Sequence, residues 1–115
     1  IIGSKGAAFH PGLNMTGAQL IIRKGFRQAV DSYSSFFEND HRTPTGLAGY
    51  LKERGLTKLT FAGLATDYCV AYSALDARKL GLGAEVLLGA CRGIDLMGSM
   101  DVMLEKMQGA GVVLS

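Results

Sequence analysis

Three segments of the sequence carry side chains that could act together on a substrate: Cys69, Lys24 and the loop over residues 90–96. Lys24 ends one predicted strand, Cys69 follows the next strand, and the loop follows a third. In an open parallel sheet, ligand sites form beyond the carboxyl ends of the strands. We therefore expect the fold to bring together groups that lie far apart along the chain.

Cys69 occupies a position that suits a reactive thiol. It lies three residues after Thr66, in the predicted first turn of a helix, where free N–H groups and the helix dipole favour an anion. Such a position raises the thiolate fraction of a cysteine, and Lys24 could supply a neighbouring positive charge. The alternative is that Cys69 is a small buried apolar residue and that Lys24 is a solvated lysine at a strand end. Position alone leaves both interpretations open.

The remaining polar candidates have simpler explanations. Asp67 is the carboxylate nearest to the thiol in sequence, and an aspartate at a helix start is typically a cap rather than a base. Cys91 lies in the predicted 90–98 loop without a capping residue or a cation partner, so it is interpreted as structural. His10 and His41 lack ligand spacing to each other or to a carboxylate cluster, so no metal site is predicted inside this chain.

Aromatic side chains are concentrated in a predicted long loop over residues 26–42. Tyr33, Phe36 and Phe37 could stack on a flat ring ligand, or they could anchor the loop to the body of the protein. Tyr33 is the better ligand candidate because a serine flanks it on each side.

The periodicity of apolar residues predicts an α/β fold. Short strands that do not alternate are separated by helical stretches, which indicates a parallel, Rossmann-like sheet with helices on both faces in three α/β/α layers. The predicted strands cover residues 19–24, 59–64, 84–89 and 112–114. The predicted helices run from Thr43-Pro44 to Gly55, from Thr66-Asp67 to Leu80, and from Ser99 onwards.

Helix signals in the sequence support these boundaries. Proline suits a first helical turn, serine, threonine and aspartate suit N-caps, and glycine suits a helix end. The expected inward-facing residues are Leu47, Tyr50 and Leu51 in the first helix, Val70, Ala74, Leu75 and Ala77 in the second, and Val102, Met103 and Met107 in the third.

Composition limits the class of protein. The chain has 115 residues, of which 48% are hydrophobic and 19% charged, as expected for one folded domain rather than a disordered segment. The net charge of +2 gives no argument for nucleic acid, and no apolar run is long enough to cross a bilayer. Two cysteines fit a reducing, cytoplasmic location. Because the sequence begins at Ile1 rather than methionine, we expect it to be part of a longer protein.

Several motifs together resemble a known enzyme family. The motifs are Gly63-Leu64-Ala65-Thr66-Asp67-Tyr68-Cys69-Val70, Asp31-Ser32-Tyr33-Ser34-Ser35-Phe36-Phe37, Cys91-Arg92-Gly93-Ile94-Asp95, Lys24-Gly25 and Phe9-His10-Pro11. In their order along the chain, they resemble the nicotinamidase (pyrazinamidase) branch of the isochorismatase-like cysteine hydrolases. The resemblance implies that residues 1–115 form a single-domain C-terminal portion of an isochorismatase-like hydrolase fold, with the N-terminal strands absent. An exposed sheet edge would then make the isolated chain poorly soluble or partly unfolded.

The resemblance implies an activity. Enzymes of this branch convert nicotinamide, and pyrazinamide, to nicotinate and ammonia in NAD salvage, with a Cys-Asp-Lys triad, a cysteine acyl-enzyme and a divalent metal (Zn, Fe or Mn). Cys69 matches the nucleophile and Lys24 the triad lysine. The triad aspartate and the metal ligands match positions upstream of Ile1, so no metal ligand is expected in this chain.

The resemblance also implies how the site is built. Leu64 and Ala65 match a cis peptide of the family. The backbone N–H groups of Ala65 and Cys69 match the oxyanion hole, and Tyr33 and Tyr68 match positions that line the pyridine pocket.

Other functions stay open at this point. An N-carbamoyl or ureido amidohydrolase of the same superfamily would share the cysteine and the lysine. An isochorismate vinyl-ether hydrolase is less favoured because that chemistry needs no cysteine nucleophile. Alternatively, the chain is a catalytically incomplete fragment that acts as an interaction or relic domain. The expected partner is a small aromatic amide, with no nucleic acid and no membrane; association as a homo-oligomer is left open.

Overall fold

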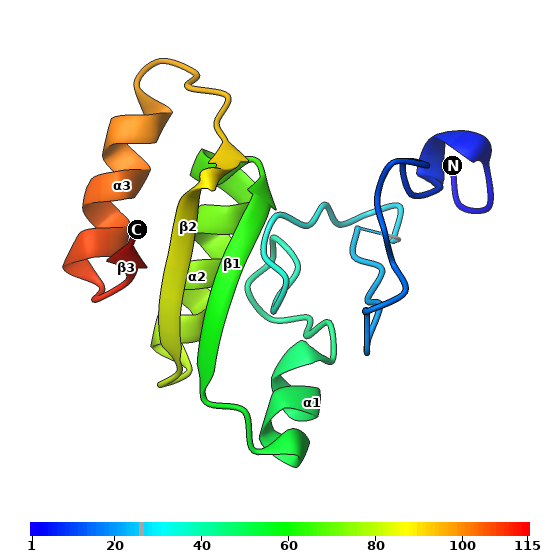
Figure 1. Cartoon of the computed structure of the whole chain (residues 1–115), viewed down its shortest axis with the longest axis horizontal. Coiled ribbons are helices and arrows are strands. Elements are labelled where there is room, and N and C mark those ends of the chain that lie inside the picture. Colours follow the sequence, from blue (N-terminus) through cyan, green and yellow to red (C-terminus); the bar gives the residue numbers. More distant parts are fainter. Residues whose placement is uncertain (26) are drawn as a thin grey trace.

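Three parallel strands organise this chain (Figure 1). The computed structural model describes residues 1–25 and 27–115. Strand β1 spans Lys58–Leu64, β2 spans Gly83–Arg92 and β3 spans Val113–Leu114, in the spatial order β1-β2-β3. The predicted α/β fold with a parallel sheet is therefore confirmed.

Helices precede and connect the strands. Helix α1 (Leu47–Arg54) lies beside the amino end of β1 (Figure 1). After β1, a π-helix over Thr66–Val70 leads directly into α2 (Ala71–Lys79), and α3 (Ser99–Gly109) connects β2 to β3. A 3₁₀ helix over Lys5–Ala7 is the one regular element within residues 1–25. This N-terminal segment projects away from β2 and β3 (Figure 1).

The core lies between the sheet and helices α2 and α3. The two helices contact each other as well as the strands, which places both on one face of the sheet. The buried apolar residues of this layer include Ala71, Ala74, Ala77, Val86, Met103 and Met107. On the opposite face, Thr60, Ala62, Leu87 and Val113 are exposed. A second helical layer over that face is not found among the described residues.

An irregular register marks the carboxyl end of β1. Phe61 pairs with Val86, but Gly63 already pairs with Cys91, so β2 contains extra residues between these two pairs. Gly63 has a φ of 124°, a conformation that side chains with a Cβ atom rarely adopt. Bulges of this kind redirect the end of a strand, and they are common next to active sites.

Two predicted boundaries before β1 are wrong. Residues 19–24 form no strand, because no neighbouring strand within the described residues is available to accept their backbone hydrogen bonds. Helix α1 begins at Leu47 rather than at Thr43-Pro44, because Pro44 forms an antiparallel bridge with Phe37 and Gly46 adopts a left-handed conformation. Its predicted end at Gly55 is confirmed. The predicted loop is irregular over residues 27–42 apart from the Phe37–Pro44 bridge, and Phe26 lies outside the described residues.

The predicted helix caps are also wrong. The residue at the cap position before the π-helix is Ala65, and neither Thr66 nor Asp67 caps it, since the Asp67 side chain is directed to a later loop. The N-cap of α3 is Gly98 rather than Ser99.

Two further predictions fail at the level of single residues. Cys91 lies within β2, where it is buried, and not in a loop. Val102 does not share the buried face of Met103 and Met107, because half of its surface is exposed.

Met107 tests the packing of α3. Its side chain is fully buried, so Met107→Ala is expected to lower the free energy of unfolding by about 2–5 kcal/mol. The exposed Val102 on the same helix is the matched control, and Val102→Ala should change stability by no more than about 0.5 kcal/mol. Urea unfolding of the full-length natural protein that contains this sequence measures the free energy of unfolding of both variants. Equal losses of stability in Met107→Ala and Val102→Ala would contradict the described packing.

Candidate active site

Cys69 and Lys24 meet although they are 45 positions apart. The Nζ atom of Lys24 lies 3.4 Å from Sγ of Cys69 and also donates a hydrogen bond of 2.8 Å to the carbonyl oxygen of Ser32. Both side chains are partly buried. The fold thus brings a basic side chain into contact with a thiol, as the sequence predicted for this pair.

Cys69 lies in a π-helix over Thr66–Val70, which departs from regular α-helix geometry. The N–H groups of Tyr68 and Val70 both donate to the carbonyl oxygen of Ala65, at 3.1 Å each. The peptide bond that joins Leu64 to Ala65, immediately before this turn, is cis. Backbone N–H groups at a turn of this kind are donors that can stabilise an oxyanion.

A buried serine connects the nucleophile to the aromatic loop. The hydroxyl of Ser73 donates to the carbonyl oxygen of Cys69 at 2.6 Å, and it accepts a hydrogen bond of 2.8 Å from the N–H of Ser35. The hydroxyl of Thr45 in turn donates to the carbonyl oxygen of Ser35. Sequence analysis missed Ser35 and Ser73. The signal for Ser73 is its spacing, since a helical serine can donate to the carbonyl four residues earlier.

A cavity of about 410 Å³ opens beside the thiol. Its lining consists of Tyr33, Leu64, Ala65, Tyr68, Cys69, Ile94 and Leu96. The ring of Tyr33 lies 5.5 Å from that of Tyr68 and is stacked at the same distance on Tyr72. Tyr72, which sequence analysis missed, does not line the cavity but stacks on Tyr33 and supports its ring. The cavity combines aromatic and aliphatic walls with a thiol, a lining that suits a small flat ligand.

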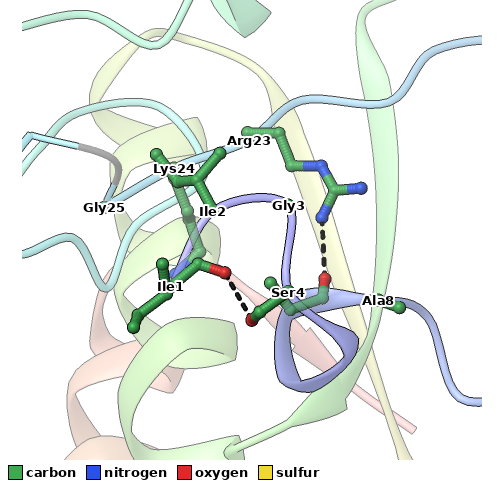
Figure 2. A pocket seen from close by; sticks show the side chains of 9 residues that line it. Ile1, Ile2, Gly3, Ser4, Ala8, Arg23, Lys24 and Gly25 are labelled. Atoms are coloured by element: carbon green, nitrogen blue, oxygen red, sulfur yellow. Dashed lines mark hydrogen bonds between the residues drawn. The ribbon is translucent and has the colours of Figure 1, made fainter.

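A larger cavity of about 700 Å³ lies near the N-terminus, between residues 1–8 and 23–25. Figure 2 shows its lining side chains, with Arg23 donating to the carbonyl oxygen of Ala7 and the Ser4 hydroxyl donating to that of Ile1. Lys24 lines this cavity but Cys69 does not. Of these two cavities, the smaller one is therefore the candidate site, because Cys69 lines it.

Asp67 is a buried residue whose carboxylate accepts three hydrogen bonds. Its Oδ1 accepts the N–H of Ile94 at 3.0 Å, and its Oδ2 accepts the N–H of Asp95 at 2.8 Å and the hydroxyl of Ser99 at 2.6 Å. Burial opposes ionisation, but the Ser99 hydroxyl and the two N–H groups more than offset it, so the pKa of Asp67 lies below its ordinary value.

The described residues contain no group of three or more His, Cys, Asp or Glu side chains that could hold a metal ion. His10 and His41 thus do not converge on a ligand set. A pyrazinamidase of Pyrococcus horikoshii solved in complex with zinc is 32% identical to this chain. Its TM-score is 0.61, over 74% of this chain and 44% of its own.

Residues 1–25 and 27–115 include no helix that is both long and apolar enough to span a membrane.

Comparison with known proteins agrees with this geometry. The model of the isochorismatase domain matches residues 1–115. The chain belongs to the isochorismatase family. It is 51% identical over 110 residues to the nicotinamidase of Acinetobacter baylyi, covering 96% of this chain and 51% of that protein.

Two solved structures show the same fold as this isochorismatase-family chain. An Acinetobacter baumanii nicotinamidase has a TM-score of 0.94 at 55% identity, over 97% of this chain and 54% of its own. A protein of L. infantum, solved in complex with nicotinate, has a TM-score of 0.92 at 38% identity, over 98% and 56%. The chain thus spans about half the length of the relatives it matches.

The role of Lys24 can be tested without a substrate. Lys24→Gln removes the positive charge beside Sγ of Cys69, so alkylation of Cys69 by iodoacetamide at neutral pH should slow by roughly three- to tenfold. The matched control is Arg23→Gln, which removes a neighbouring charge that contacts the carbonyl oxygen of Ala7 instead. Peptide mapping should place the label on Cys69 and not on the buried Cys91; equal rates in both variants would contradict the contact.

Asp67 gives a prediction for acid stability. Its pKa in the folded chain lies below the ordinary 3.8, so its ionised form stabilises the fold above that pH and the contribution is lost as the pH falls through the folded-state pKa. The difference in free energy of unfolding between wild type and Asp67→Asn should be constant from about pH 7 to about pH 5. It should shrink below pH 3.8. A difference that grows on acidification would refute the sign.

Proposed function

We propose that the protein carrying this chain is a nicotinamidase-type cysteine amidohydrolase, which converts nicotinamide, and also pyrazinamide, to nicotinate and ammonia. The observation that carries this proposal is the 3.4 Å contact between Lys24 and Cys69 beside a cavity with aromatic walls. The relatives named nicotinamidase support the choice of a pyridine amide. Such an activity belongs to NAD salvage.

The proposed reaction is acyl transfer through a thioester. The Cys69 thiolate attacks the carboxamide carbon, and Lys24 favours that thiolate by its charge. The C–N bond then breaks and the nitrogen leaves as ammonia after it receives the proton that the thiol lost. Water hydrolyses the thioester, which releases nicotinate and returns the thiol. The net reaction consumes one water for each amide.

The N–H of Cys69 is the first proposed oxyanion donor, because it belongs to the residue whose sulfur would attack the amide carbon. The N–H of Ala65 is the second proposed donor. One such donor in a site that excludes water lowers the free-energy barrier of the reaction by roughly 3 kcal/mol. Tyr33 and Tyr68 are proposed to contact the pyridine ring, and Tyr72 holds Tyr33 in place.

The general base and any divalent metal are proposed to come from residues outside these 115. No described carboxylate hydrogen-bonds to Cys69 or Lys24, and the carboxylate of Asp67 is occupied by three donors. The described residues do not fit a metal site, so no step of the reaction above is assigned to a metal. A cytoplasmic location and homo-oligomerisation stay predictions.

Removal of the nucleophile is the direct test. Cys69→Ala should abolish ammonia release from nicotinamide by the full-length natural protein that contains this sequence, with a loss of at least about 10³-fold, because the proposed thioester forms on the Cys69 sulfur. Cys91→Ala, which removes the buried cysteine of β2, is the matched control and should retain activity.

Three outcomes would count against this proposal. Persistent hydrolysis in Cys69→Ala would exclude the nucleophile assignment. A preference for an N-carbamoyl or ureido substrate over nicotinamide would favour the other amidohydrolase class. No hydrolysis of either substrate by the wild type would favour the interaction or relic domain.

A further inference from the structure

The turn over residues 94–99 has a backbone that needs external support. It follows β2 and precedes α3, and both Asp95 and Met97 have positive φ angles, of 55° and 53°. Residues with a Cβ atom seldom adopt this conformation, and a long side chain such as that of Met97 is especially rare there. Such backbone persists where the surroundings determine it strongly, and it occurs preferentially at functional sites.

The support comes from Asp67, which lies 27–32 positions earlier in the sequence. Its carboxylate accepts the N–H groups of Ile94 and Asp95 directly. The hydroxyl of Ser99 donates to the same carboxylate and accepts the N–H of Leu96. Hydrogen bonds to a buried charged group are stronger than those between neutral groups.

The turn supplies one wall of the Cys69 cavity. Ile94 and Leu96 line it together with Tyr33 and Tyr68. Both aliphatic side chains are about 60% exposed (63% and 61%), although apolar groups gain from being covered. A flat ring in the cavity would cover part of this apolar surface.

We propose that Asp67 is a positioning residue that holds Ile94 and Leu96 as the aliphatic wall against which the substrate ring packs. This inference rests on the proposed function and assigns the ring selectivity of the same site. Asp67 touches neither the thiol nor the reacting carbon in this role. Its loss should therefore weaken ring binding and leave the chemical step nearly unchanged.

Two variants of the full-length natural protein that contains this sequence test the proposal. Asp67→Asn replaces one acceptor by a donor that faces an N–H group or a hydroxyl, and Ser99→Ala removes the bridge to Leu96. For nicotinamide, we expect KM to rise about tenfold in Asp67→Asn and less in Ser99→Ala, with kcat within about threefold of wild type. Hydrogen exchange at the amides of Ile94 and Asp95 should accelerate in both. Asp101→Asn, an exposed carboxylate in the first turn of α3, is the matched control and should change none of these quantities.

Two results would overturn the proposal. Unchanged exchange at both amides would show that Asp67 does not hold the turn, and a fall in kcat at constant KM would show that it acts on the chemistry. If Asp67→Asn does not fold, the exchange rates and the KM of Ser99→Ala decide in its place.

A further measurement keeps this inference separate from the proposed function. If the wild type does not hydrolyse nicotinamide, the proposed function fails, and the wall is tested by alkylation of Cys69 with N-phenylmaleimide and N-methylmaleimide. The wild type should prefer the ring-bearing reagent, and Asp67→Asn should lose that preference several-fold. An unchanged ratio of the two rates would refute the wall.

Discussion

The contact between the Lys24 ammonium and the Cys69 thiol joins two parts of the chain that share no strand or helix. Lys24 ends an irregular N-terminal segment, whereas Cys69 lies in the π-helix between β1 and α2. The same ammonium also donates a hydrogen bond to the carbonyl oxygen of Ser32, next to Tyr33 in the aromatic loop. One half-buried cation therefore contacts both the thiol and the backbone beside Tyr33.

The residues that line the cavity are supported by residues that do not line it. Ser73 connects the Cys69 turn to the loop that carries Tyr33, and Tyr72 stacks on Tyr33 from behind. Asp67 holds the turn that carries the aliphatic wall. Groups supported in this way lose little conformational freedom when a ligand binds, which is the physical basis of a preorganised site.

The sequence predicted those parts of the structure that local patterns determine. The core strands β1, β2 and β3 and the glycine that ends α1 follow from periodicity and turn residues. Lys24 lies beside Cys69 as predicted, but it does not end a strand, so the geometry of parallel sheets does not explain the contact. Residues 19–24 show why local patterns fail, since their apolar character matches a strand but the described fold offers no partner. The prediction that Asp67 is a helix cap fails for a different reason. Its position in the sequence is typical of a cap, but its hydrogen-bond donors lie far along the chain, and only the folded molecule brings them close to the carboxylate.

The central claim is that Cys69 forms a covalent acyl intermediate, and acid-quenched mass spectrometry during turnover of nicotinamide tests it most directly. The account predicts a species of the intact protein heavier by one nicotinoyl group, with the group mapped to the Cys69 peptide and lost when substrate is exhausted. Ammonia release with no adduct on Cys69, or with the adduct on another residue, would contradict it.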